Sequence, residues 1–121
     1  MARPVLTRHA RGLDAEALAA AALEREGWQL LARRLRTQAG ELDLVAERDG
    51  LLAFVEVKRR PTLEGAAAAL GPRQRARLLA AAEAALAENP GWGRAGVRFD
   101  VLLVDAAGRV RRVADAFRLE G

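Results

Sequence analysis

Apolar residues recur along this chain with two different periods, one typical of helices and one typical of strands. From residue 11 to residue 26 they recur every three or four positions, which predicts an amphipathic helix with a C-terminal cap at Gly27. Asp14 and Glu16 then stand near the positive end of the helix dipole, where acidic side chains are stabilising. The predicted apolar stripe consists of Leu18, Ala19, Ala22 and Leu23.

Shorter apolar segments with the two-residue period of strands come next. Residues 28–36 predict a first strand, and residues 40–60 predict two strands that fold back on each other at Asp49-Gly50. An Asp-Gly pair between apolar runs is the strongest short-range signal for a hairpin. Both alternating faces of the hairpin's second strand carry apolar residues, which predicts a central strand covered on both sides.

The second half of the chain predicts another helix and one or two more strands. The helix covers residues 72–88, with a proline at its start and Asn89-Pro90-Gly91 at its end. A loop over residues 61–71 precedes it. Residues 97–105 predict a buried strand and residues 109–113 a short one, after which Phe117 is expected on the core. The order of helix, three strands, helix and one or two strands indicates an α/β domain with a mixed sheet flanked by helices.

The predicted hairpin places charged residues opposite each other. Counting outward from the turn, Asp43 faces Glu56 and Glu41 faces Lys58. Directly paired side chains share a face of the sheet, with Cβ atoms about 4.5–5.5 Å apart. Two carboxylates at that distance repel each other, and a divalent cation with oxygen ligands neutralises such a pair. An ordinary cross-strand ion pair between Lys58 and Glu41 is the alternative.

The rarity of lysine in this chain is a second reason to consider Lys58 a functional residue. Lys58 is the only lysine among the 20 Lys and Arg residues. Lysine carries a compact charge with a tunable pKa, which suits contact with one water molecule or one phosphate oxygen. Chance in an arginine-biased chain explains the same observation equally well. His9 is the only histidine, and a lone histidine is more often solvated than a metal ligand.

Composition limits the class of protein. With 121 residues, 51% of them apolar and 30% charged, we expect one globular domain over residues 1–121, with residues 1–9 as a loose arm. The net charge of +4 weakly favours a polyanionic partner. The absence of cysteine excludes disulfides and thiolate metal sites. No run approaches the ~18 apolar residues of a membrane-spanning helix, and no secretory signal follows the first basic residues, so we expect no membrane association and a cytoplasmic location.

Arginines gather near the predicted hairpin. Those of the first strand either contact phosphate or protect a sheet edge from further pairing. Those in the first turns of the second helix oppose the helix dipole; a bound phosphate would account for them, and chance is an equal alternative. The strand arginines are Arg33, Arg34 and Arg36, and the helix arginines are Arg73, Arg75 and Arg77.

Taken together, the motifs resemble a known family. An acidic residue on one strand followed by Glu-x-Lys on the next is similar to the PD-(D/E)xK nuclease core of restriction endonucleases and archaeal Holliday-junction resolvases. The chain is more closely similar to the YraN family of uncharacterised bacterial proteins. Two positions depart from that family, because Ala15 stands where Gly is usual and Arg73 where Lys is common. The motifs that carry the resemblance are Gly12-x-x-Ala15-Glu16-x-x-Ala19, GELDL at 40–44, FVEVKRR at 54–60, Arg73-Gln74 and Arg98-Phe99-Asp100.

The resemblance implies a restriction-endonuclease-like fold with a metal-dependent site. Asp43 and Glu56 would bind Mg²⁺ or Mn²⁺, with the backbone carbonyl of Val57 as a further ligand. Lys58 would orient or help deprotonate the attacking water and stabilise charge at the phosphate. Glu16, which the residues alone explain better as first-turn charge, would complete the acidic cluster as a further metal ligand. The residues implied in nucleic-acid binding are Arg59, Arg60, Arg73 and Gln74.

The expected function is therefore hydrolysis of phosphodiester bonds in structured or branched DNA, with DNA favoured over RNA. No base-reading motif is present, so recognition by shape is expected. The alternative is a nucleic-acid-binding domain that keeps the fold without physiological cleavage. A third and weaker interpretation is a protein-interaction module with a structural ion-pair hairpin, which predicts that Asp43→Ala destabilises the fold rather than abolishing cleavage. The resemblance is also compatible with a homodimer.

Overall fold

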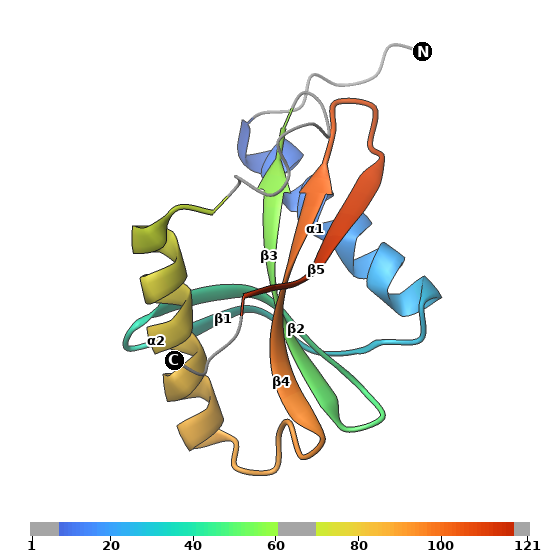
Figure 1. Cartoon of the computed structure of the whole chain (residues 1–121). Helices are drawn as coiled ribbons and strands as arrows, with labels where there is room; N and C mark the ends of the chain where they lie inside the picture. Colours follow the sequence, from blue (N-terminus) through green and yellow to red (C-terminus); the bar gives the residue numbers. More distant parts are fainter. Residues whose placement is uncertain (1–7, 61–69, 118–121) are drawn as a thin grey trace.

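Two helices and five strands make up the computed structural model of this chain, which describes residues 8–60 and 70–117 (Figure 1). Their order is the one that the hydrophobic pattern predicts. The elements are α1 (Arg8–Arg25), β1 (Gln29–Thr37), β2 (Gly40–Arg48), β3 (Leu51–Arg59), α2 (Pro72–Glu88), β4 (Gly96–Val104) and β5 (Val110–Phe117).

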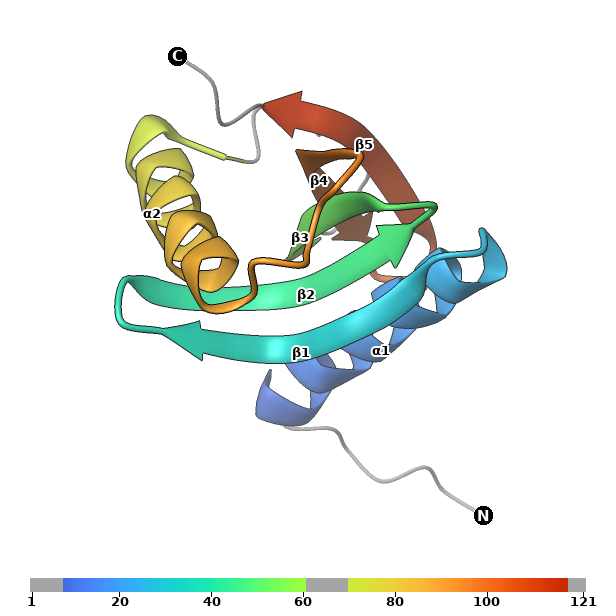
Figure 2. The same ribbon diagram turned by 90° about the horizontal axis from the view of Figure 1, so that it is seen from below.

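The strands form one mixed sheet in the order β1-β2-β3-β4-β5. Neighbouring strands are antiparallel except β3 and β4, which are parallel and are connected through α2. The two helices lie on opposite faces of the sheet (Figure 2). The predicted α/β architecture, with a mixed sheet flanked by helices, is confirmed.

A separate hydrophobic core fills the space between the sheet and each helix. Phe54 of β3 packs on the α2 side, where its ring centroid is 5.5 Å from that of Phe99. Val55 packs on the α1 side with Leu23 and Trp28. Because successive residues of β3 are buried on opposite faces, β3 is a central strand covered on both sides, as predicted. Each buried Phe or Leu contributes about 1.5–3 kcal/mol, so the base of the site is held rigidly.

Helix α1 begins earlier than its sequence pattern predicts. It starts at Arg8, so its first turn contains no acidic residue and Glu16 lies more than two turns into the helix. The first-turn explanation for Asp14 and Glu16 is therefore wrong. Residues 8 and 9 of the predicted arm, which include His9, belong to the helix, and the remainder of that arm lies outside the described residues.

The buried stripe of α1 is also rotated from the predicted one. Leu18 is 38% exposed and lies against Gly108 in the β4–β5 turn. Alanines face the sheet instead of Leu18, because small side chains let the helix backbone approach the strands closely. The buried stripe consists of Ala15, Ala19, Ala20 and Leu23.

The helix ends follow the sequence signals. Gly27 has φ +90 and donates its N–H to Glu24, while the N–H of Trp28 reaches the carbonyl of Leu23, so α1 ends in a Schellman motif. Helix α2 covers its predicted range, and the side chain of Asn89 donates to the carbonyl of Ala85 at the end. In the described ranges, neither helix has the length and apolar character needed to cross a membrane.

The predicted end of the last strand needs correction, and the predicted loop before α2 lies mostly outside the described residues. Strand β5 runs to Phe117, beyond the predicted end at residue 113, because the backbone of Phe117 continues the ladder to Phe99 of β4. The pattern of residues 114–116 alone does not show this pairing. Most of the predicted loop over residues 61–71 lies outside the described residues.

Candidate active site

The β2–β3 hairpin has the turn and the register that the sequence predicts. Asp49 has φ 53 and Gly50 has φ 83, as a type I′ turn requires. Pairing then runs from Arg48 opposite Leu51 to Leu44 opposite Val55. This is the register that brings Asp43 of β2 next to Glu56 of β3.

The two strands separate one step before that pair. The described β2–β3 pairs end at Leu44 and Val55, whereas β2 stays paired with β1 as far as Thr37 and Gly40. At the point of separation, the Oδ2 atom of Asp43 accepts a hydrogen bond of 2.8 Å from the backbone N–H of Val57. Asp43 therefore occupies the place of the next ladder bond, and its charge raises the pKa of the neighbouring Glu56.

The predicted pairing of Glu41 with Lys58 is wrong. Once β2 diverges from β3, Glu41 lies beside arginines of β1, with carboxylate oxygens 3.7 Å from Arg34 Nε and 3.5 Å from Arg36 Nε. The Nζ atom of Lys58 lies 3.8 Å from Oε1 of Glu56. Lys58 therefore belongs to the Asp43–Glu56 group rather than to a structural cross-strand pair with Glu41.

A cavity of about 180 Å³ opens over the two carboxylates. Strands β2 and β3 form its floor, and the first turns of α2 form its wall. The Nε2 atom of Gln74, on α2, donates a long hydrogen bond of 3.5 Å to Oε1 of Glu56. Arg77, one turn after Arg73, also lines the cavity, so one of the three helix arginines that a bound phosphate would account for lies at the site. The lining residues are Gly40, Glu41, Asp43, Glu56, Gln74, Arg77 and Leu78.

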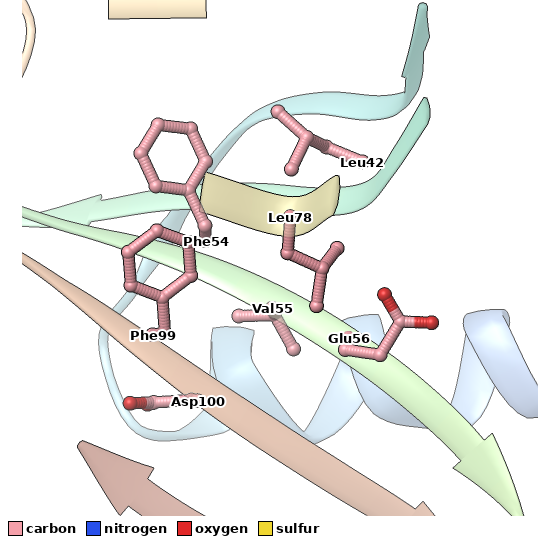
Figure 3. Close-up of a pocket in the computed structure, with 7 residues that line it drawn as sticks. All are labelled: Leu42, Phe54, Val55, Glu56, Leu78, Phe99 and Asp100. Atoms are coloured by element: carbon pink, nitrogen blue, oxygen red, sulfur yellow. The ribbon is translucent and has the colours of Figure 1, made fainter. Parts of the chain in front are cut away.

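Glu56 has a strongly perturbed carboxyl group. Burial raises its pKa to about 8, and the charge of Asp43 and hydrogen bonding to Asp43 add to the rise, while Lys58 and Arg77 oppose it. Figure 3 shows the structural cause: the carboxyl group of Glu56 extends past Leu78, at the end of an apolar group that includes Phe54 and Phe99. The Glu56 carboxyl group therefore keeps its proton to a higher pH than an ordinary glutamate does.

Glu16 reaches this region from α1 on the other face of the sheet. Its side chain is 16% exposed and lies 3.6 Å from Arg34 Nε. Burial raises the pKa of Glu16; Arg34 lowers it, and the charges of Asp43 and Glu41 raise it further. The first helix thus brings an acidic side chain into the electrostatic reach of Asp43, and its role as a metal ligand stays a prediction.

The predicted nucleic-acid contacts have different positions relative to the cavity. Gln74 lines it. Arg59, Arg60 and Arg73 are exposed at the end of β3 and the start of α2, outside the cavity wall. The N–H of Arg60 bonds to the carbonyl of Val104, so this pair of arginines continues from the rigid parallel ladder. Their role in binding stays a prediction.

The carboxylate pair fits a site for Mg²⁺ or Mn²⁺ with few protein ligands. In the described parts of the chain, no group of three or more His, Cys, Asp or Glu residues is placed to hold a metal ion. Mg²⁺ is commonly bound by one or two carboxylates together with waters and substrate phosphate, and Asp43 and Glu56 offer that donor set. The charge of Asp43 raises the pKa of Glu56, and a cation bound between the two carboxylates would relieve that repulsion.

Comparisons with known proteins place the chain in a family. Residues 15–104 match the model of the uncharacterised protein family UPF0102. The chain belongs to this family. A UPF0102 protein of Granulibacter bethesdensis is 67% identical over 109 residues, covering 90% of this chain and 69% of the relative. One from Azorhizobium caulinodans is 54% identical over 113 residues, covering 93% and 86%. These matches agree with the family that the sequence motifs indicate.

A search of solved structures gives more distant matches. A repair endonuclease from Pyrococcus abyssi is 20% identical, with a TM-score of 0.46, and the match covers 86% of this chain but 41% of that one. SfsA from Pyrococcus furiosus, in complex with Ca²⁺, is 18% identical with a TM-score of 0.33, covering 87% and 63%. This UPF0102 chain therefore spans less than two thirds of the length of either protein.

Proposed function

We propose that this UPF0102 protein is a metal-dependent endonuclease that hydrolyses phosphodiester bonds in structured or branched DNA. One observation carries the proposal: Asp43, Glu56 and Lys58 gather where β2 and β3 separate, beside a cavity open to a ligand. Two carboxylates and a lysine on a rigid strand pair suit phosphoryl chemistry, which needs a bound cation, an oriented water and a positive charge near the phosphate.

Each residue has a chemical task in this proposal. Asp43 and Glu56 hold the divalent cation, with the Val57 carbonyl and Glu16 as further candidate ligands. The cation, when bound, supplies an activated water and neutralises charge at the phosphate. Lys58 would orient that water, and its ammonium group, which lies beside Glu56, would stabilise negative charge at the phosphate. Water attacks phosphorus, one ester P–O bond breaks, and the leaving oxygen takes up a proton.

Substrate binding in this proposal depends on shape and backbone charge. Arg59, Arg60 and Arg73 contact phosphates outside the cavity, and Gln74 contributes from its wall. Arg77 joins this set because its side chain lines the cavity. Phosphate contacts position a nucleic acid without reading its sequence, so a substrate distinguished by its branching or distortion is expected.

A substrate panel tests the proposal. It contains a four-way junction, a flap, a nicked duplex, a plain duplex, single-stranded DNA and structured RNA, each with Mg²⁺ and with Mn²⁺. We expect cleavage of a structured DNA by the wild type and loss of cleavage in Lys58→Ala, with folding and DNA binding retained. A wild type that cuts nothing in the panel, or a Lys58→Ala variant that cuts as fast as the wild type, would contradict the proposal.

A nucleic-acid-binding domain without cleavage is the second candidate function. It is favoured by the absence, in the described residues, of a group of three or more candidate metal ligands around the Asp43–Glu56 pair. It predicts tight binding that falls steeply with salt, together with no cleavage of any panel member. Calorimetry with Mn²⁺ separates the two candidates further, because only the nuclease requires a cation at Asp43 and Glu56.

A further inference from the structure

Strand β1 contains a strained residue directly across from the candidate site. Arg34 has φ +50, although it is not a glycine and lies inside a strand. Its neighbours are regularly paired, Arg33 with Leu44 and Leu35 with Leu42, which places Arg34 opposite Asp43. A non-glycine residue in the left-handed region costs free energy and persists only where its surroundings impose it.

The strain coincides with a change in the faces of β2. Leu42 and Val45 both pack in the core on the α2 side, whereas Leu44 packs on the α1 side. The strict alternation of side chains therefore resets at Asp43, opposite Arg34. The backbone step at Arg34 lets β1 follow this reset.

Glu41 forms ion pairs with both Arg34 and Arg36. Arg34 Nε lies 3.7 Å from Glu41 and 3.6 Å from Glu16, and Arg36 Nε lies 3.5 Å from Glu41. In all three ion pairs the guanidinium atom closest to the carboxylate is Nε, so two amino groups of each arginine remain as further donors. In the part of the chain that the structure describes, those amino groups donate no hydrogen bond to protein. Arg34 is 46% exposed and Arg36 is 89% exposed.

We propose that Arg34 and Arg36, anchored by Glu41, form a binding surface for the phosphate backbone of a nucleic acid on the β1 side of the cavity. Two features favour this over simple protection of the sheet edge. Glu41 itself lines the cavity, so the two guanidinium groups stand at its rim. An arginine anchored through Nε presents its remaining donors in a fixed fork, which matches the oxygens of a phosphate. Diffuse edge charge does not need a carboxylate that pairs with both arginines.

The proposed surface supplements the arginines of α2 and β3. Arg77 lines the cavity from α2, whereas Arg34 and Arg36 approach from β1. A backbone that contacts both groups passes over Asp43 and Glu56. The inference rests on the proposed function for the class of ligand. It adds the path that the nucleic-acid backbone takes across the site, which the catalytic residues alone do not define.

Binding without cleavage tests the surface. Fluorescence anisotropy with a labelled four-way junction and a labelled duplex, both in EDTA, compares the wild type with Arg34→Gly and Arg36→Ala. Glycine adopts the backbone of residue 34 without strain. We expect each variant to bind about tenfold more weakly at low salt, with a salt slope reduced by about 1. Arg94→Ala, an exposed arginine in the α2–β4 turn, removes the same charge away from the cavity and is expected to leave affinity nearly unchanged.

Glu41→Gln separates an anchored surface from diffuse charge. This substitution raises the net charge, so diffuse attraction predicts tighter DNA binding, whereas loss of the anchor predicts weaker binding. Tighter binding by Glu41→Gln, or equal weakening in all three arginine variants, would overturn the inference. Failure of the proposed function has a different signature, since a wild type that binds in EDTA but cuts nothing with Mg²⁺ or Mn²⁺ leaves the binding surface intact. Melting curves for every variant verify that it is folded.

Discussion

The metal-free protein is expected to lose stability as the pH rises from about 4.5 to 8, and Glu56→Gln is expected to abolish most of that loss. The pKa of Glu56 is raised from 4.5 to about 8 in the folded protein, first by burial and then by Asp43. Between these values the folded state binds more protons than the unfolded state, so the free energy of unfolding falls with rising pH. The contribution is complete below pH 4.5 and is lost as the pH approaches 8.

The size of the effect follows from the shift. At 1.36 kcal/mol per pKa unit, the rise corresponds to at most about 5 kcal/mol. Solvent in the cavity screens the charges around Glu56, whose side chain is 13% exposed, and we expect about 2–3 kcal/mol in practice. A glutamine mimics the neutral carboxyl group, so Glu56→Gln resembles the wild type at low pH and exceeds its stability by this amount near pH 8.

Urea unfolding in EDTA, followed by tryptophan fluorescence across this pH range, measures the difference. Glu83→Gln, at an exposed position of α2, is the matched control and is expected to follow the wild type. Parallel pH curves for Glu56→Gln and the wild type would refute the reasoning, because they would mean that Glu56 is not held protonated by its surroundings. Mg²⁺ added near pH 8 is expected to stabilise the wild type more than Glu56→Gln, since the cation replaces the proton on Glu56 and glutamine offers no carboxylate to bind it.

Three other substitutions, at two positions, separate the site from the structure that supports it. Asp43→Asn keeps an oxygen for the Val57 N–H and removes a charge beside a buried carboxyl, so its metal-free melting temperature is expected within a few degrees of the wild type, with Mn²⁺ binding lost in calorimetry. Asp43→Ala leaves that N–H without its partner and is expected to cost about 1–2 kcal/mol in urea unfolding; equal stability of the two variants would mean that the bond is unimportant. Asp100, which is buried, lies 3.0 Å from Arg98 and 3.8 Å from Arg112. Asp100→Asn is expected to cost about 3 kcal/mol without changing the affinity for Mn²⁺, and a change in that affinity would place Asp100 in the site.

Most of the acidic site was predictable because its residues are close in the hairpin. A two-residue turn at Asp49-Gly50 fixes the register, and the register alone brings Asp43 next to Glu56. The register does not predict where β2 separates from β3. That separation turns Asp43 towards the N–H of Val57. For the same reason the partner of Lys58 was predicted wrongly, since strict pairing holds only while the strands stay together.

The contributions of the helices to the site were harder to predict. Arg77 is three residues after Gln74, a spacing that places both on one helix face, so the Arg73-Gln74 motif offered a signal for it. On β1, Arg34 was predicted only as one of three arginines that contact phosphate or protect the sheet edge, because a positive φ at an arginine cannot be inferred from residue type. Glu16 was assigned to a helix start that lies two turns earlier in the structure.

The sequence by itself determined the order of elements, the C-terminal ends of both helices, the start of α2 and the turn of the hairpin. Gly27, Asp49-Gly50 and Pro72 act through the local backbone, whose preferences need no distant partner. Tertiary structure alone decided which face of α1 is buried, where β2 leaves β3, and how Arg34 reaches two carboxylates from different elements. Those features depend on packing between segments far apart in the chain, and a residue's own propensity does not encode them.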